Sequence, residues 1–287
     1  MNNKGSFGHL PEQYSRPQNA NIVIIPVVYD KTSTWIKGSE KGPDAIIEAS
    51  AHMELYDIET DSQVYKKGIY TDGRIEGLRE PQEIVAAVEE RAGKWLERDK
   101  FVVVIGGEHT VSIGSVKAHS KIYKDLTVLQ LDAHADLRDE FEDSKFSHAC
   151  VMARIKEICP IVQVGIRSMD VSEKEFLDND RVFFCKDIHN TKDWSAKAIA
   201  RLTTPKVYVT IDMDVFDPSI MPSTGTPEPG GLLWYDVLAL LKLLCTKKEV
   251  VGFDVVELCP AKTNKAPDFL TAKLIYKFLS YKFGDSK

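Results

Sequence analysis

The sequence of 287 residues is poor in cysteine and contains no long apolar run. Its five cysteines are an odd number and form no CxxC pair, which argues against a disulfide framework and against a thiolate zinc site. No apolar stretch approaches the ~18 residues of a membrane-spanning helix, and Met1–Gln18 has no signal-peptide core. We therefore expect a cytoplasmic protein that does not enter a membrane.

The chain also lacks a basic stripe, internal repeats and long linkers rich in proline, glycine or serine. It has 37 basic and 43 acidic residues and a net charge of −6, which argues against nucleic acid as a partner and favours a cationic substrate. A length of 287 residues suits one large domain. We predict a single domain over residues 1–287 that includes a polar N-terminal segment, residues 1–20.

Short apolar runs alternate with amphipathic helical patterns along the chain. The predicted strands are Ile22–Val28, Gly68–Tyr70, Phe101–Ile105, Leu126–Leu131, Ile161–Val164, Arg181–Phe184, Lys206–Ile211 and Val250–Val256. One predicted helix begins at Pro43. The others cover Pro81–Leu96, His109–Tyr123, Trp194–Leu202, Leu233–Leu244 and Pro267–Tyr281. This alternation predicts a three-layer α/β/α fold with a doubly wound, mainly parallel eight-stranded sheet.

The most informative motif is Asp-Ala-His-Ala-Asp at 132–136, directly after the predicted strand Leu126–Leu131. If the backbone stays extended, Asp132, His134 and Asp136 project to the same side. Carboxylate oxygens and an imidazole nitrogen together are suitable ligands for a divalent metal. An acidic turn without a metal is the alternative interpretation.

A second acidic pair, Asp212 and Asp214, ends the predicted strand Lys206–Ile211. Neighbouring carboxylates beside a buried strand repel each other unless a cation neutralises them. The four aspartates of the two motifs carry a charge of about −4 at neutral pH, which two divalent cations would balance. Oxygen and imidazole ligands without a thiolate favour manganese over zinc, and two ions ~3.5–4 Å apart can activate a shared water.

A third motif, Gly-Gly-Glu-His-Thr at 106–110, follows the apolar strand Phe101–Ile105. Its glycines allow a tight turn into a helix and place His109 at the helix start. By itself the motif is typical of a glycine turn with a capping glutamate. Next to the two acidic motifs, it offers His109 as a second imidazole ligand.

Together the three motifs resemble the signature regions of the ureohydrolases, the family of arginase, agmatinase and related guanidino hydrolases. The resemblance rests on residues 106–110, 132–136 and 212–218, and it extends in order from about Ile22 to Tyr281. Gly-Pro-Asp-Ala-Ile at 42–46 also resembles a helix start of the family. The resemblance implies an arginase-like fold, two Mn2+ ions per subunit and a homotrimer or homohexamer.

The resemblance implies a ligand set for each manganese ion. One ion would be bound by His109, Asp132, Asp136 and Asp212. The other would be bound by Asp132, His134, Asp212 and Asp214, so that Asp132 and Asp212 bridge the two ions.

The resemblance also implies three catalytic residues. Phe-Ser-His-Ala at 146–149 is similar to the segment that carries the catalytic histidine, His148, although the family often has glycine where this chain has Ala149. Glu257 is similar to the glutamate that holds the substrate guanidinium. Asp136 would accept a proton from the attacking water and pass it to the departing amine, while His148 would relay protons to solvent.

The implied reaction converts a small cationic guanidino compound to urea and an amine. The loop Leu137–Ser147 departs from the arginase pattern and resembles that of agmatinases. Its acids Glu140, Glu142 and Asp143 favour a cationic tail, or simply belong to a solvated loop. We therefore predict hydrolysis of agmatine to putrescine and urea, with a guanidino acid or arginine as alternatives. The loop Ser223–Gly231 is expected to shape the pocket wall.

Two other classes are compatible with parts of the sequence. Deacetylases of a similar fold use one zinc ion, whereas Asp214 and the His109 motif argue for a second metal. A non-catalytic metal-binding protein is the other class, but the candidate ligands, His148 and Glu257 are all present. Cys150 and Cys259 fit best as small packing residues.

Overall fold

The computed structural model describes residues 5–284, and its centre is one sheet of eight strands. The strands are β1 Ile22–Pro26, β2 Ile69–Thr71, β3 Phe101–Ile105, β4 Leu126–Leu131, β5 Ile161–Ile166, β6 Val182–Phe184, β7 Lys206–Asp212 and β8 Glu249–Val256. Their order is β2-β1-β3-β8-β7-β4-β5-β6, and all seven pairs are parallel. Each strand that we predicted from the sequence is confirmed.

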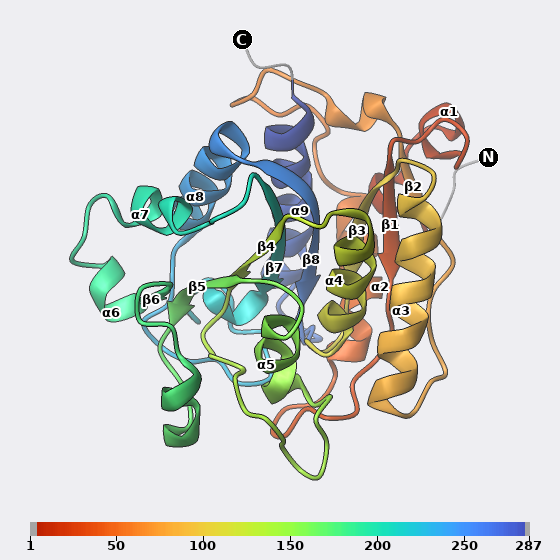
Figure 1. Cartoon of the computed structure of the whole chain (residues 1–287). Coiled ribbons are helices and arrows are strands. Elements are labelled where there is room, and N and C mark those ends of the chain that lie inside the picture. Colours follow the sequence, from red (N-terminus) through yellow and green to blue (C-terminus); the bar gives the residue numbers. More distant parts are fainter. Residues whose placement is uncertain (1–4, 285–287) are drawn as a thin grey trace.

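Helices cover both faces of this sheet (Figure 1). They are α1 Glu12–Ser15, α2 Gly42–Ser50, α3 Pro81–Leu96, α4 Val111–Ile122, α5 Val151–Lys156, α6 Cys185–Ile188, α7 Trp194–Ala200, α8 Trp234–Lys247 and α9 Ala266–Phe283. Helices α2, α7, α8 and α9 pack on one face, and α3, α4 and α5 pack on the other. The predicted doubly wound α/β/α fold is therefore confirmed.

Local sequence explains the long helices better than the short ones. In α3, Pro81 occupies the first turn, where its missing N–H has no partner to lose, and Glu83 reaches back to the Glu80 N–H. The α4 helix begins at Val111, so His109 lies in the preceding turn and not in the helix as predicted. Helices α5 and α6 were not predicted, because one or two turns are too short to show a helical period.

Short 3-10 turns complete the connections. They are η1 Phe7–His9, η2 Ser39–Lys41, η3 Val64–Lys67, η4 His148–Cys150, η5 Val171–Phe176 and η6 Met213–Val215. Within the N-terminal segment, Phe7 and Leu10 are buried in the core on the face of the sheet that α2, α8 and α9 cover. None of the helices in residues 5–284 has the length and apolar character needed to cross a membrane.

The sheet order places the three signature motifs side by side. Strands β3, β8, β7 and β4 are consecutive neighbours at the centre of the sheet. Because all are parallel, their carboxyl ends lie at one edge, where ligand sites of such sheets occur. Asp132 and Glu257 directly follow β4 and β8, Asp212 is the last residue of β7, and His109 lies in the turn after β3.

Candidate metal and active site

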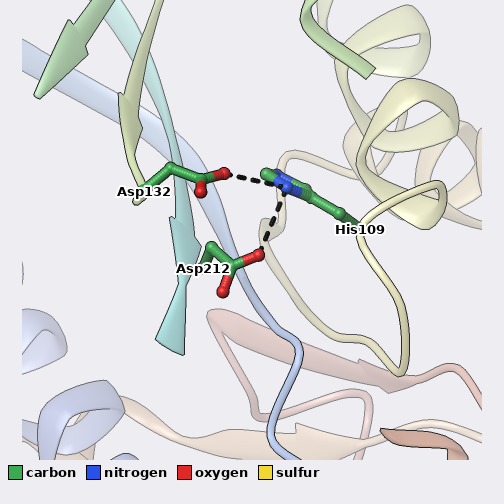
Figure 2. A group of neighbouring side chains, drawn as sticks. All are labelled: His109, Asp132 and Asp212. Carbon is green, nitrogen blue, oxygen red and sulfur yellow. Dashed lines mark ion pairs between the residues drawn. The ribbon is translucent and has the colours of Figure 1, made fainter. Parts of the chain in front are cut away.

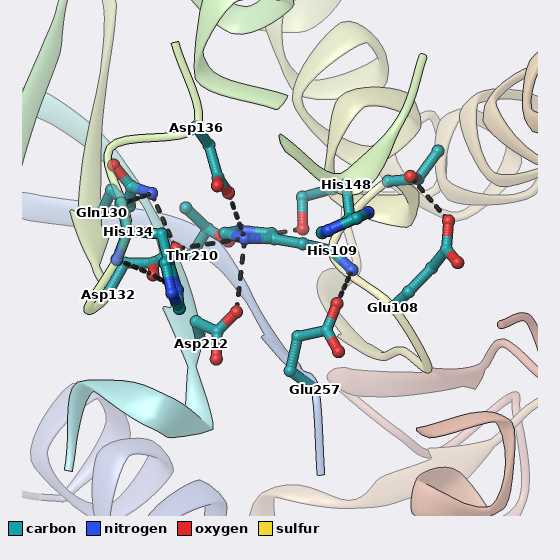
Figure 3. Close-up of polar contacts among 12 residues, drawn as sticks. Glu108, His109, Gln130, Asp132, His134, Asp136, His148, Thr210, Asp212 and Glu257 are labelled. Carbon is teal, nitrogen blue, oxygen red and sulfur yellow. Dashed lines mark hydrogen bonds and ion pairs between the residues drawn. The ribbon is translucent and has the colours of Figure 1, made fainter. Parts of the chain in front are cut away.

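Three carboxylates converge around one nitrogen of His109; Figure 2 shows Asp132 and Asp212, and Figure 3 adds Asp136. His109 Nδ1 lies 3.2 Å from Asp132 Oδ2, 3.0 Å from Asp136 Oδ2 and 3.5 Å from Asp212 Oδ2. Candidate ligand atoms of His109, Asp132 and Asp212 all lie within 4.8 Å of one another, and all three residues are buried. One buried cluster thus combines an imidazole with several carboxylates.

A second cluster adjoins the first and shares Asp132 with it. His134 Nδ1 lies 2.9 Å from Asp214 Oδ2 and 3.6 Å from Asp132 Oδ1. Candidate ligand atoms of Asp132, His134 and Asp214 again lie within 4.8 Å of one another. The structure therefore brings together all six residues that the sequence predicted as ligands, in two groups joined through Asp132. A bridging role of Asp212 stays a prediction.

The backbone reaches this geometry by turns, so the expected alternation along an extended strand is wrong. Strand β4 ends at Leu131, and Asp136 has a left-handed φ of 52°. Asp214 lies in the 3-10 turn η6, and its N–H donates to Asp212 Oδ1 at 2.8 Å. The chain turns tightly after β4 and at the end of β7. These turns, rather than an extended strand, bring the carboxylates of the 132–136 and 212–214 motifs close together.

Gly107 allows the His109 turn to pass close to the segment that follows strand β1. A Cβ atom at Gly107 would lie 2.0 Å from the carbonyl oxygen of Tyr29, so no other residue fits without movement of the backbone. The Gly107 carbonyl also accepts the N–H of Glu257 at 2.7 Å. The glycine motif thereby connects the His109 turn to the end of β8.

The hydrogen bonds of His109 show that the first cluster suits a cation. His109 Nε2 lies 2.9 Å from Thr210 Oγ1, and Thr210 donates its own proton to Asp254 Oδ1 at 2.6 Å. Thr210 Oγ1 therefore accepts the Nε2–H of His109, and in the neutral ring Nδ1 keeps its lone pair. This buried nitrogen has no hydrogen-bond partner among the described residues and faces three carboxylates. Burial disfavours a proton on His109, but the carboxylates of Asp132 and Asp136 outweigh burial and raise its pKa well above the usual range. A lone pair that faces carboxylate oxygens thus requires a proton or a metal cation between them.

The electrostatics of the carboxylates agree with this conclusion. Burial, and then the negative charge of Asp132, raise the pKa of Asp136 to about 7. Burial, followed by the charges of Asp214 and Asp132, raises the pKa of Asp212 well above its usual range. A bound cation favours the charged carboxylates and offsets both effects. The donor set of oxygen and imidazole fits divalent metal ions, and it includes no thiolate.

The clusters form the floor of a pocket of about 280 Å³. This volume is near the lower end for ligand pockets, roughly 300–1,000 Å³, and suits a small molecule. His148 and Glu257 both line the pocket, as predicted from the sequence. Gly225 and Thr226 line it as well, so the loop 223–231 contributes to the wall as expected.

Glu257 faces the clusters from the end of β8. Its backbone is left-handed, with a φ of 64°, and its Oε1 accepts the His109 N–H at 2.7 Å (Figure 3). Burial, and then the charge of Glu108, raises the pKa of Glu257 well above its usual range. A bound guanidinium would favour the charged carboxylate and form paired, charge-assisted hydrogen bonds with it.

His148 lies at the start of η4 and is held by residues that the sequence did not identify. Its Nδ1 lies 3.1 Å from Thr32 Oγ1, and Thr32 contacts the buried Glu108. Burial is the main cause that lowers the pKa of His148 to about 4. His148 is therefore neutral at neutral pH.

The pocket mouth differs from the sequence prediction. Glu140, Glu142 and Asp143 are exposed and do not line the pocket, which agrees with the solvated-loop interpretation. Arg138 and Phe141 of the same loop do line it. The acids at the mouth are instead contributed by the segment after β5, which includes Asp170 and Glu173, and no sequence motif indicated them.

The two mouth acids have different surroundings. Glu173 is buried, and its oxygens accept the backbone N–H groups of Leu137 and Asp170, both at 2.7 Å. Asp170 uses Oδ1 for the N–H and hydroxyl of Ser172, while Oδ2 has only a long contact of 3.8 Å with Arg138. Asp170 Oδ2 is therefore the carboxylate oxygen at the mouth that is most available to a ligand.

Comparisons with known proteins agree with this site. The sequence model of the arginase family matches residues 20–280. The chain is 38% identical to the N(1)-aminopropylagmatine ureohydrolase of Synechocystis, over 100% of this chain and 99% of that protein. It is 30% identical to the agmatinase of Pyrococcus horikoshii, over 90% of this chain and 91% of that protein. The structure of the agmatine ureohydrolase of Thermoplasma volcanium superposes with a TM-score of 0.83 at 32% identity, covering 92% of this chain and 90% of that one.

The fold and the two ligand clusters define a metal-dependent hydrolase, and the chain belongs to the arginase family. Within this family it is an agmatinase-like ureohydrolase, an enzyme that hydrolyses guanidino compounds. The family assignment disfavours the deacetylase and the non-catalytic alternatives.

Proposed function

We propose that this enzyme releases urea from a guanidino compound with a cationic amine tail, of which agmatine is the simplest. The observation that supports the reaction is the pair of ligand clusters joined through Asp132, with Glu257 beside them in one small pocket. Two divalent ions, which we propose to be Mn2+, would supply an activated water and positive charge for the tetrahedral centre. Trimeric or hexameric assembly and a cytoplasmic location stay predictions.

We propose that the protein side chains divide the work as follows. Glu257 holds and orients the guanidinium through charge-assisted hydrogen bonds, with its carbon over the two clusters. Asp136 accepts a proton from the attacking water and transfers it to the nitrogen of the departing amine. His148 then exchanges protons between the pocket and solvent. Urea and the free amine leave together, and the overall reaction consumes one water.

The charge of the pocket supports an amine tail. Arg138 lies with its guanidinium 4.6 Å from the centre of the Phe141 ring and faces Asp170 and Glu173. Its guanidinium lies 3.7 Å from the buried carboxylate of Glu173, which weakens its attraction for a substrate carboxylate. Asp170 Oδ2 remains accessible at the mouth, where it would accept hydrogen bonds from a distal ammonium group.

A second candidate substrate is the aminopropyl derivative of agmatine. The relatives from Synechocystis and from Thermus thermophilus, which is 36% identical over 96% of this chain, are both named N(1)-aminopropylagmatine ureohydrolase. This compound is longer than agmatine and carries an additional amine. Hydrolysis would yield urea and the corresponding triamine.

A substrate panel tests the proposed function. Manganese-loaded protein is incubated with agmatine, aminopropylagmatine, guanidinobutyrate and arginine, and urea is measured. We expect both amine-tailed compounds to have kcat/KM values at least about tenfold above guanidinobutyrate, a difference of ~1.4 kcal/mol. A preference for guanidinobutyrate or arginine would contradict the cationic tail. Absence of urea from all four would indicate a non-catalytic protein.

Replacement of the Asp170 carboxylate at the pocket mouth should weaken binding of amine-tailed substrates while the rate of the chemical step is retained. We expect Asp170→Asn to raise the KM for the preferred amine-tailed substrate about five- to tenfold, because a charge-assisted hydrogen bond of ~1.5 kcal/mol becomes a neutral one. The kcat should stay within about twofold. Glu140→Gln, which neutralises an exposed acid outside the pocket, is the matched control and should leave KM unchanged. Equal KM values for Asp170→Asn and wild type would show that the distal ammonium group of the substrate does not bind Asp170.

A further inference from the structure

His148 is held on one side by Thr32, and Thr32 is held by Glu108. Thr32 Oγ1 lies 3.1 Å from His148 Nδ1 and accepts the backbone N–H of His148 at 2.9 Å. It also lies 2.7 Å from Glu108 Oε1. Glu108 is fully buried, so its hydrogen bonds must come from the protein. These contacts connect the candidate catalytic histidine to a carboxylate outside the pocket.

Hydrogen-bond donors surround Glu108. Its Oε2 accepts the backbone N–H groups of Lys31 at 2.7 Å and of Thr32 at 2.6 Å. Its Oε1 lies 2.8 Å from Thr110 Oγ1 and 2.7 Å from Thr32 Oγ1. Burial raises the pKa of Glu108, and the donors of Thr32, Thr110 and Lys31 oppose this by stabilising its charged form. A backbone N–H can only donate, and the ionised carboxylate that these donors favour can only accept. The one hydroxyl proton of Thr32 is therefore donated to Glu108, and Thr32 Oγ1 has only lone pairs for His148.

We infer that Glu108 and Thr32 fix His148 in the tautomer that carries its proton on Nδ1. Thr32 Oγ1 has two lone pairs, of which one accepts the backbone N–H of His148 and the other accepts Nδ1–H. The opposite ring nitrogen, Nε2, keeps its lone pair. Glu108 and Thr32 are thus positioning residues that act through His148. The tautomer follows from the hydrogen bonds, whereas its catalytic consequence rests on the proposed function.

A second carboxylate–threonine–histidine chain lies in the same site. Asp254 accepts the Thr210 hydroxyl at 2.6 Å, and Thr210 Oγ1 lies 2.9 Å from His109 Nε2. There the threonine fixes Nε2–H and leaves the Nδ1 lone pair facing the carboxylates. In each chain a buried carboxylate determines the direction of the threonine hydroxyl, and the threonine determines which imidazole nitrogen keeps its lone pair.

The tautomer decides what His148 can do in the pocket. With a free lone pair, Nε2 accepts a proton from a group bound in the pocket, and the ring becomes an imidazolium that still donates Nδ1–H to Thr32. No hydroxyl or carboxylate has to reorient when the proton arrives. With the proton on Nε2 instead, neutral His148 would offer the pocket only a donor.

Glu108→Gln should reverse the tautomer. The two backbone N–H groups at the Oε2 position require the amide oxygen there, which places the NH₂ group toward Thr32. Thr32 Oγ1 then accepts from this NH₂ and from the His148 backbone N–H, so its own proton turns to His148 Nδ1. His148 is then expected to carry its proton on Nε2.

Neutron diffraction from crystals of the manganese-loaded protein at neutral pD measures the tautomer directly. We expect a deuteron on His148 Nδ1, none on Nε2, and the Thr32 deuteron directed at Glu108. Crystals of Glu108→Gln should show the deuteron on Nε2. Ser147→Ala is the matched control, since Ser147 Oγ also lies 3.3 Å from Nδ1 and is a competing partner; this variant should keep the wild-type tautomer.

Kinetics provide an independent readout on protein that retains its metal content. We expect Thr32→Val to lower kcat about 10- to 100-fold, part of the ~10²–10⁴-fold effect of a positioned acid or base, with KM within about twofold. Thr32→Ser, which retains the hydroxyl, should restore most of kcat. If Thr32 only supported the fold, its replacement by valine would leave the deuteron of His148 on Nδ1.

Two results would overturn the inference: a wild-type deuteron on Nε2, or a Glu108→Gln variant with an unchanged tautomer. Neither depends on activity. If wild type releases no urea from any guanidino compound, the proposed function fails while the deuteron positions still test the tautomer.

Discussion

Removal of the metal ions is expected to abolish urea release and to lower the melting temperature by roughly 5–10 °C. An ion present at ~100 times its Kd stabilises the folded state by ~2.7 kcal/mol, and ~1 kcal/mol corresponds to a few degrees in a chain of this size. The physical reason is the cluster of buried carboxylates around His109 Nδ1, which lose their counter-charge. Chelation followed by calorimetry measures this effect.

The control for chelation is restoration with excess Mn2+, which should return both activity and melting temperature. Elemental analysis of the untreated protein should give about two manganese ions per chain. About one zinc ion per chain would contradict the binuclear site. An unchanged melting temperature after complete removal of metal would mean that the clusters are stable without a cation, contrary to the argument from the His109 lone pair.

Asp136→Asn is expected to reduce kcat by at least about 10³-fold while the fold is retained. The amide has no lone pair basic enough to take a proton from water, and loss of a positioned base costs ~10²–10⁴-fold. Asparagine has the same shape and tolerates the left-handed backbone at this position, where φ is 52°. The Asp136 carbonyl, which accepts the N–H groups of Met152 and Ala153, is unchanged.

Asp143→Asn is the matched control for this variant. Asp143 also has a left-handed backbone, with a φ of 59°, but it is exposed and lies outside the pocket. It should retain wild-type kcat and stability. Asp136→Asn must be assayed at saturating Mn2+ with its metal content measured, because the carboxylate also faces His109 Nδ1 at 3.0 Å. Full urea release by metal-loaded Asp136→Asn would refute the assigned role.

The sequence indicated six candidate ligands that the structure brings together, but it predicted the backbone conformation of the 132–136 motif wrongly. Asp132, His134 and Asp136 were expected to share one side of an extended strand, whereas the chain turns after Leu131. The error arises because residue types reveal metal chemistry, while a left-handed residue such as Asp136 gives no signal when it is not glycine.

The substrate mouth shows where sequence reasoning is weakest. The loop acids Glu140, Glu142 and Asp143 suggested a cationic tail, yet they are exposed and do not line the pocket, whereas Asp170 after β5 does. A run of charges in a loop is usually solvated. Which acids reach a pocket depends on how separate loops pack, so a single sequence does not contain that information locally.

The sequence by itself determined the eight strands, the α/β class and the six candidate ligands. Each of these depends on neighbours in the chain: apolar runs form buried strands, and closely spaced acids and histidines indicate metal binding. The tertiary structure alone decided which groups meet. Glu108 and Thr32 are 76 residues apart, Thr32 and His148 are 116 apart, and His109 and Glu257 are 148 apart. Hydrogen bonds act over ~3 Å, so only the parallel order of the central strands could bring these groups into contact.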